Sequence, residues 1–171
     1  MTEIIGQALG IICVLLGFVN YQLKTHKQVL YVNILTVACF SLHYFLIGAY
    51  VGMALNGVAV LRNIVYYFTG KNEKHNKIAA TIFTVIMGAM GALSWQGAYS
   101  ILIILGLMIN SYCMSLQNPN ALRKSILVSS PLVLLYNCFV LSLGGIVYES
   151  VGMLSAVIGL LRYKEKKSSE C

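Results

Sequence analysis

Long apolar runs separated by short polar segments form the main pattern along this chain. A helix that crosses a bilayer needs about 20 mostly apolar residues, and seven runs reach or approach this length: 3–23, 29–48, 51–69, 78–94, 98–116, 125–143 and 145–163. The pattern predicts an all-α integral membrane protein with seven transmembrane helices. We expect a single membrane domain over 1–171, with no soluble domain of useful size. Glu3, rather than a basic segment, precedes the first run, which favours a membrane span over a cleaved signal peptide.

Composition supports this prediction. Hydrophobic residues make up 58% of the chain and charged residues 10%, whereas soluble domains are roughly 25% charged. These values exclude a water-soluble globule and a disordered chain. The net charge of +7 comes mainly from short basic clusters between apolar runs, which are typical of membrane anchors rather than nucleic-acid binding. We therefore expect the lipid bilayer as a partner, and no nucleic acid.

The basic clusters also predict an orientation. With seven spans, every Lys and Arg except Arg62 falls on one side of the membrane, and the loops on the other side contain neither residue type. The positive-inside rule then places the N-terminus outside and the C-terminus, with the basic tail 164–171, in the cytoplasm.

Short motifs recur in the two halves of the chain. Val51-Gly52-Met53 followed by Leu61-Arg62 returns as Val151-Gly152-Met153 followed by Leu161-Arg162. Recurrence of this kind indicates that the chain contains two copies of one structural unit.

The recurrence predicts two triple-helix repeats, 3–69 and 98–163, joined by a linker helix at 78–94. Three is an odd number of spans, so a single linker helix gives both repeats the same orientation in the membrane. We expect two parallel triple-helix bundles in a 3+1+3 arrangement. This repeat symmetry is similar to that of the SWEET sugar transporters.

More specific stretches are LHYFLIG at 42–48 with Leu61-Arg62-Asn63, and SLGG at 142–145 with Tyr148-Glu149-Ser150 and Arg162. In order and spacing they resemble the YgjV-type family of bacterial inner-membrane proteins over essentially the whole chain. The resemblance implies the bacterial inner membrane as the location. It also implies a topology similar to SWEET, PQ-loop and PnuC-type transporters.

Some features of those transporters are missing. The chain has no Pro-Gln dipeptide, and we expect Pro131 to be its only proline within a helix, with Pro119 in a loop. No Asn in the seventh span matches the paired substrate-contacting Asn of SWEETs. The resemblance therefore implies the scaffold, and sugar transport is not inferred.

Polar side chains inside the apolar runs are the candidate functional residues. They are costly in a bilayer and usually face the interior of a helix bundle or a cavity. Helical spacing places several of them on shared stripes in different spans, as a central solute pathway requires. The alternative is packing, because such side chains often only hydrogen-bond between helices, for about 0.6 kcal/mol each. The candidates are Asn33, His43, Asn56, Arg62, Asn63, Asn110, Asn137 and Glu149.

Three candidates have more specific interpretations. Arg62 either extends to the inner headgroups or anchors the carboxylate or phosphate of a ligand. His43 and Glu149 lie near the outer ends of their spans, where they form either a proton-coupled gate or an interfacial His and a solvated carboxylate at a helix start. Pro131 is a candidate hinge.

The sequence is compatible with two classes of function. The first is a small-solute transporter or facilitator in which the two three-helix repeats alternate access to a central site. The second is a non-transporting scaffold, sensor or assembly partner with the same fold. We do not expect an enzyme, a cofactor or a metal site, because the three His residues are scattered, Asp is absent and the five Cys lack metal-type spacing. The solute is unknown, and association into a homo-oligomer stays open.

Overall fold

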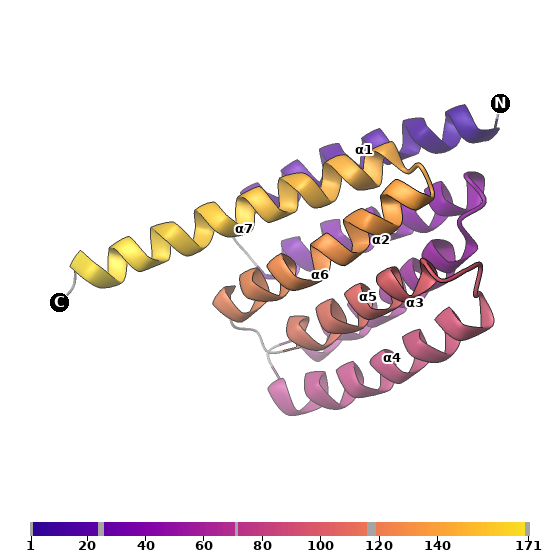
Figure 1. Cartoon of the computed structure of the whole chain (residues 1–171). Helices are drawn as coiled ribbons and strands as arrows, with labels where there is room; N and C mark the ends of the chain where they lie inside the picture. Colours follow the sequence, from indigo (N-terminus) through magenta and orange to yellow (C-terminus); the bar gives the residue numbers. More distant parts are fainter. Residues whose placement is uncertain (1, 24–25, 71, 116–118, 170–171) are drawn as a thin grey trace.

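The computed structural model describes residues 2–23, 26–70, 72–115 and 119–169. These residues form seven α-helices (Figure 1), whose bounds are α1 Thr2–Gln22, α2 His26–Leu46, α3 Tyr50–Thr69, α4 Glu73–Leu93, α5 Ser100–Met114, α6 Pro119–Phe139 and α7 Leu143–Ser169. Each predicted apolar run corresponds to one helix, so the predicted all-α architecture is confirmed.

Local signals in the sequence explain several helix ends. Gly70 ends α3 with φ 61°, and its N–H donates to the carbonyl of Tyr66 over 3.2 Å. Glycine reaches this left-handed conformation without steric cost. Asn72 precedes α4, where its side chain accepts a hydrogen bond from the N–H of His75, as expected of an N-cap residue.

Several helix boundaries differ from the prediction: α4 begins at Glu73 instead of residue 78, and α6 ends at Phe139 instead of residue 143. Two further differences have a clear physical reason. Pro119 does not lie in a loop but begins α6, because the first position of a helix needs no N–H donor and proline already has a helical φ. The predicted start of this helix at residue 125 is therefore wrong. Similarly, α7 continues to Ser169, beyond the predicted end at residue 163. Lys and Glu are good helix formers, so the polar sequence there does not end the helix.

Five of the described helices are long and apolar enough to cross a membrane, namely α1, α2, α3, α4 and α7. Helix α5 is also apolar but has only 15 residues. Helix α6 has a polar first part that includes Arg123 and Lys124. Large apolar side chains point outward, such as Phe68 and Leu93 with 80% and 83% exposure, while Arg62 is 2% exposed. This distribution suits a protein surrounded by lipid.

Successive helices run in alternating directions (Figure 1), so α1, α3, α5 and α7 all begin at the same end of the bundle. We call it the turn end, because the connections at 47–49, 94–99 and 140–142 lie there. The opposite end is the basic end, since described Lys and Arg residues occupy the first two turns of α2, α4 and α6.

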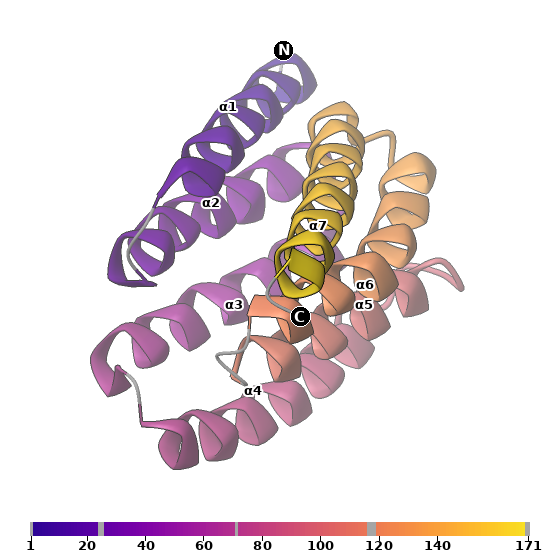
Figure 2. The same ribbon diagram turned by 90° about the vertical axis from the view of Figure 1, so that its left-hand side faces the viewer.

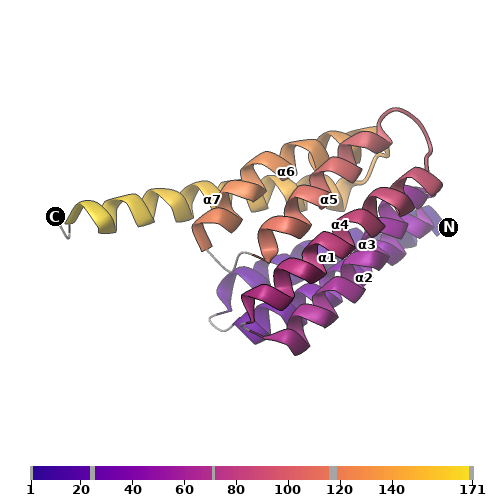
Figure 3. The same ribbon diagram turned by 90° about the horizontal axis from the view of Figure 1, so that it is seen from below.

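The helices form a closed ring. Each helix packs against the next one, and α1 packs against α7 to complete the ring, as the view along the bundle shows (Figure 2). Helix α3 also touches α5, whereas α4 contacts only these two helices and lies outside them (Figure 3). The ring leaves a space between α2, α3, α5, α6 and α7 for the polar side chains described next.

Candidate functional site

A cavity with both polar and apolar lining lies at the centre of the ring. Its inner part has a volume of about 70 Å³ and is lined by residues of α2, α3, α5, α6 and α7. An adjoining part of about 230 Å³ extends toward the basic end, to Asn20 and Val29 near the α1–α2 connection. The two parts share six lining residues: Asn33, Leu107, Asn110, Val133, Tyr148 and Glu149. They therefore lie next to each other, with the wider part at the basic end, and we describe them together as the central cavity.

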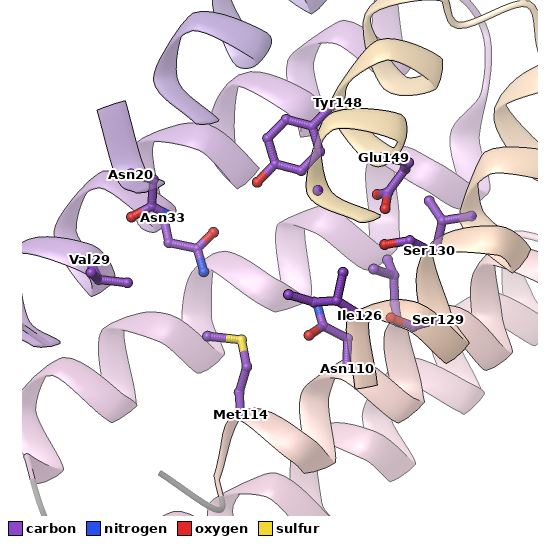
Figure 4. A pocket seen from close by; sticks show the side chains of 14 residues that line it. Asn20, Val29, Asn33, Asn110, Met114, Ile126, Ser129, Ser130, Tyr148 and Glu149 are labelled. Atoms are coloured by element: carbon purple, nitrogen blue, oxygen red, sulfur yellow. The ribbon is translucent and has the colours of Figure 1, made fainter. Parts of the chain in front are cut away.

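Amide and hydroxyl groups converge on this cavity. Figure 4 shows the side chains of Asn33, Asn110 and Tyr148 directed toward a common space in the wider region. Asn56 lines the inner part, where its Nδ2 donates to the carbonyl of Gly52 over 2.8 Å. The side-chain oxygen of Asn56 remains available for another donor.

Arg62 supplies the positive charge of the inner part. It is buried on α3, and its Nε and Nη2 donate to Oδ1 of Asn63 over 3.2 and 3.0 Å. Nη2 also lies 3.3 Å from the sulfur of Met114, and the guanidinium lies 6.0 Å from the ring centre of Tyr66. Nη1 is buried and has no hydrogen-bond partner among the described residues, which is costly for a charged group and leaves it available to bind a ligand.

Glu149 supplies a carboxyl group to both parts of the cavity. It lies on α7, and Figure 4 shows its side chain beside the hydroxyl group of Ser130 on α6. A serine hydroxyl can donate a hydrogen bond to a carboxylate. The predicted solvated position at a helix start is therefore wrong, since Glu149 is half-buried and faces the cavity.

Buried contacts close the turn end. Tyr44 donates from its hydroxyl group to Oδ1 of Asn137 over 2.7 Å, and the hydroxyl of Tyr136 accepts from the N–H of Gly52 over 3.2 Å. His43 lies between α1 and the α6–α7 connection, with Nδ1 2.7 Å from the carbonyl of Gly6. Its Nε2 lies 2.7 Å from Oγ of Ser142.

Two glutamines hold the turns at this end in a matching way. Gln7 on α1 donates to the carbonyl of Leu141 and accepts from the N–H of Leu143, both at the α6–α7 turn. Gln96, just before α5, donates to the carbonyl of Gly48 and accepts from the N–H of Val51, both at the α2–α3 turn. Each half of the chain thus holds a turn of the other half.

The comparison with known proteins agrees with these observations. The sequence model of the family Imp-YgjV, described as "Bacterial inner membrane protein", matches residues 4–167. The chain belongs to this family. The match spans the complete cavity and both sets of closing contacts, so the site lies within the YgjV part of the chain. Neither a curated protein nor a solved structure matches the sequence.

The YgjV chain brings together only part of the predicted pathway. Five of the eight candidates line the cavity: Asn33, Asn56, Arg62, Asn110 and Glu149. His43 and Asn137 belong to the contacts that close the turn end, and Asn63 positions the guanidinium of Arg62. His43 lies in the last turn of α2, near the end of its span as predicted, but its side chain is fully buried inside the bundle. Arg62 does not extend to the headgroups, because its side chain is directed inward to Asn63 and Met114.

Several members of this site were not predicted from the sequence. Tyr44, Ser142 and Gln96 are not among the candidates, although each makes a hydrogen bond that joins two helices or turns. Their position at the ends of apolar runs, next to Gly or Ser turn residues, is the sequence feature from which they could have been predicted. No group of three His, Cys, Asp or Glu side chains in the described residues could hold a metal ion.

Proposed function

We propose that this inner-membrane protein is a small-solute transporter or facilitator in which two three-helix repeats alternate access to the central cavity. The observation that carries the proposal is the cavity itself. Its polar lining comes from helices of both halves, it reaches the basic end, and hydrogen-bonded side chains close it at the turn end. Transporters of this kind place the solute at the interface of their repeats.

Matching turns support the 3+1+3 arrangement that this mechanism needs. The carbonyl of Tyr44 accepts from the N–H of Ala49 over 2.8 Å, and the carbonyl of Asn137 accepts from the N–H of Ser142 over 2.9 Å. The residue before each donor has a positive φ, 76° at Gly48 and 53° at Leu141. The α2–α3 and α6–α7 turns thus share one local geometry.

The helix contacts are compatible with the same repeat. If α1, α2 and α3 correspond to α5, α6 and α7, then the contact between α3 and α5 corresponds to the contact between α7 and α1. Both contacts exist. Helix α4 takes the position of a linker, since it packs only on α3 and α5. Alternating helix directions give both halves the same orientation.

Charge supports the orientation that we propose for the protein in the membrane. Exposed Lys27, Lys74 and Lys124 lie at the basic end, and positive residues favour the cytoplasmic side. The cavity then faces the cytoplasm, and rocking of the two repeats would separate Tyr44 from Asn137 to expose it to the other side. No chemical step is needed for this function, so we do not propose an enzyme.

Sided labelling of engineered cysteines tests alternating access. In a variant without native cysteines, Asn33→Cys and Asn137→Cys are treated with a membrane-impermeant thiol reagent from either side of the membrane. A transporter predicts reaction of position 33 from the basic side and of position 137 from the turn side. Leu154→Cys, which is exposed on α7, serves as a lipid-facing control.

The outcome distinguishes the two classes of function. A non-transporting scaffold, sensor or assembly partner predicts that position 137 never reacts, because the turn end stays closed. Reaction of position 33 from the extracellular side alone would overturn the proposed orientation, but not the proposed mechanism.

A further inference from the structure

We propose that the central cavity binds a small zwitterion with one carboxylate and one protonated amine, of the α-amino acid class. This inference rests on the proposed transport function and names its solute class. It is carried by two side chains of opposite charge, Arg62 and Glu149, which line the same inner cavity from different halves of the chain.

The carboxylate side of the solute is assigned to Arg62. Its guanidinium is buried, and Nη1 has no hydrogen-bond acceptor in the part of the chain that the structure describes. Among those side chains no acidic group forms an ion pair with it, since its bonds go to Asn63 and Met114. Arginine binds carboxylates through paired N–H groups, so a ligand carboxylate satisfies both the charge and the missing bond.

The ammonium side of the solute is assigned to Glu149. Its carboxyl group lies on the opposite half of the bundle from Arg62 and borders both parts of the cavity. The side-chain amides of Asn33 and Asn110 line the same space, and the oxygen of an amide can accept from N–H donors. A protonated amine has three such donors, which suit one carboxylate and two amide oxygens.

Charge balance favours a zwitterion over an ion of either sign. A simple anion would pair with Arg62 but leave the Glu149 carboxyl group without a cationic partner in the same cavity, and a simple cation would leave Arg62 without an anionic partner. Buried charges without partners are strongly unfavourable. A zwitterion compensates both groups and adds no net charge to the cavity.

The size of the cavity limits the solute. The inner part of about 70 Å³ holds the polar ends of the solute, and the adjoining part of about 230 Å³ receives its side chain. Val29, Met114 and Ile126 line the wider part and provide apolar contacts there. Ligand sites for drug-sized molecules are roughly 300–1,000 Å³, so peptides and oligosaccharides are too large.

Counterflow in proteoliposomes tests the proposal with the full chain. Vesicles preloaded with one of the twenty standard L-α-amino acids receive a trace of the same labelled compound outside. We expect accumulation for at least one amino acid. Two analogues should compete with this amino acid at least about tenfold less well than the unlabelled amino acid itself. One lacks the amine and the other lacks the carboxylate; for alanine they are propionate and ethylamine.

Matched variants assign each end of the solute. Glu149→Gln should remove the preference for the amino acid over the compound without the amine, and Arg62→Gln should remove the preference over the compound without the carboxylate. A purely structural defect would lower all fluxes together and leave these ratios unchanged. Glu3→Gln and Lys124→Gln alter exposed groups and should behave like the unmodified protein.

Each negative result has a defined meaning. Equal competition by propionate would show an anion site and overturn the zwitterion proposal while transport stands. Absence of counterflow for all twenty amino acids also overturns it. The sided cysteine labelling then decides separately whether alternating access survives.

Discussion

Tyr44 and Asn137 lie near the ends of α2 and α6, where their carbonyl groups make the same turn hydrogen bond, and their side chains are hydrogen-bonded to each other over 2.7 Å. Both side chains are buried. The Tyr44 ring also stacks on Phe40 and packs against the ring of Tyr136. One polar contact within an aromatic cluster therefore links the two halves of the chain at the closed end of the cavity.

Removal of the Tyr44 hydroxyl should weaken this closure. Tyr44→Phe keeps the ring contacts but leaves Oδ1 of Asn137 without its donor, and Nδ2 of Asn137 already lacks a partner among the described residues. A buried unsatisfied group costs about 1–3 kcal/mol, so we expect this loss in the free energy of unfolding, measured by denaturant titration in detergent. Tyr50→Phe, at an exposed tyrosine, is the control. Equal stability of the two variants would contradict a closing role for the bond.

Ser142 should contribute to the same closure through His43. The carbonyl of Gly6 can only accept, so Nδ1 of His43 carries the proton and Nε2 accepts from the Ser142 hydroxyl. Ser142→Ala leaves Nε2 buried without a donor, and we expect a loss of about 1–3 kcal/mol in the free energy of unfolding. Position 137 should also react faster with thiol reagents from the turn side. Ser155→Ala, within α7, should change neither quantity.

Much of the architecture could be predicted from the sequence, because the hydrophobic pattern records the environment of each helix. Seven apolar runs correspond to seven helices. The motif that recurs at Val51 and Val151 does not mark equivalent positions, because it lies at the second residue of α3 but at the ninth residue of α7. The site was only partly predictable. Polarity marks a buried residue as unusual, but it does not tell whether Asn137 meets a solute or Tyr44, since that depends on the rotation of α6 relative to α2.

The glycines at the α1–α7 contact make a sharper prediction about packing. A Cβ atom at Gly144 would overlap the backbone of Gly10, so no side-chain movement could relieve the clash. This contact completes the ring of helices. Gly144→Ala should lower the free energy of unfolding by about 1–3 kcal/mol, as overpacking does.

Gly57 offers a matched control for that substitution. It also lies in a helix, but a Cβ atom there would meet only the hydroxyl of Ser41 at 3.7 Å. Gly57→Ala should therefore be neutral or stabilising, because alanine is the better helix former. Similar destabilisation by both substitutions would show that α1 and α7 do not approach as closely as described.

Arg62 should show opposite effects on stability and function. A charge at the bilayer centre costs about 2.5–3.5 kcal/mol on insertion scales, and Nη1 has no partner among the described residues to offset this cost. Gln at this position can still donate to Oδ1 of Asn63. We expect Arg62→Gln to unfold at the same or a higher temperature than the unmodified protein while solute flux falls by at least about tenfold. A large loss of stability would instead identify Arg62 as a packing residue.

Pro131 provides the last prediction, which concerns motion rather than binding. It lies inside α6, where proline cannot donate to the carbonyl of Leu127, and an interior proline favours a bend in a helix. Its neighbours Ser130 and Val133 line the cavity, so a bend at this position can change the shape of the site. Pro131→Ala restores the missing hydrogen bond, and we expect it to raise the free energy of unfolding by up to about 3 kcal/mol.

A hinge role adds a kinetic consequence to this gain in stability. If α6 bends at Pro131 during the change of access, a straighter helix should slow the exchange and lower the maximal flux, with little change in the solute concentration at half-maximal flux. Pro119→Ala, at the first position of α6, removes a proline without restoring an interior hydrogen bond and should leave flux unchanged. Unchanged flux in a stabilised Pro131→Ala variant would contradict a hinge at Pro131.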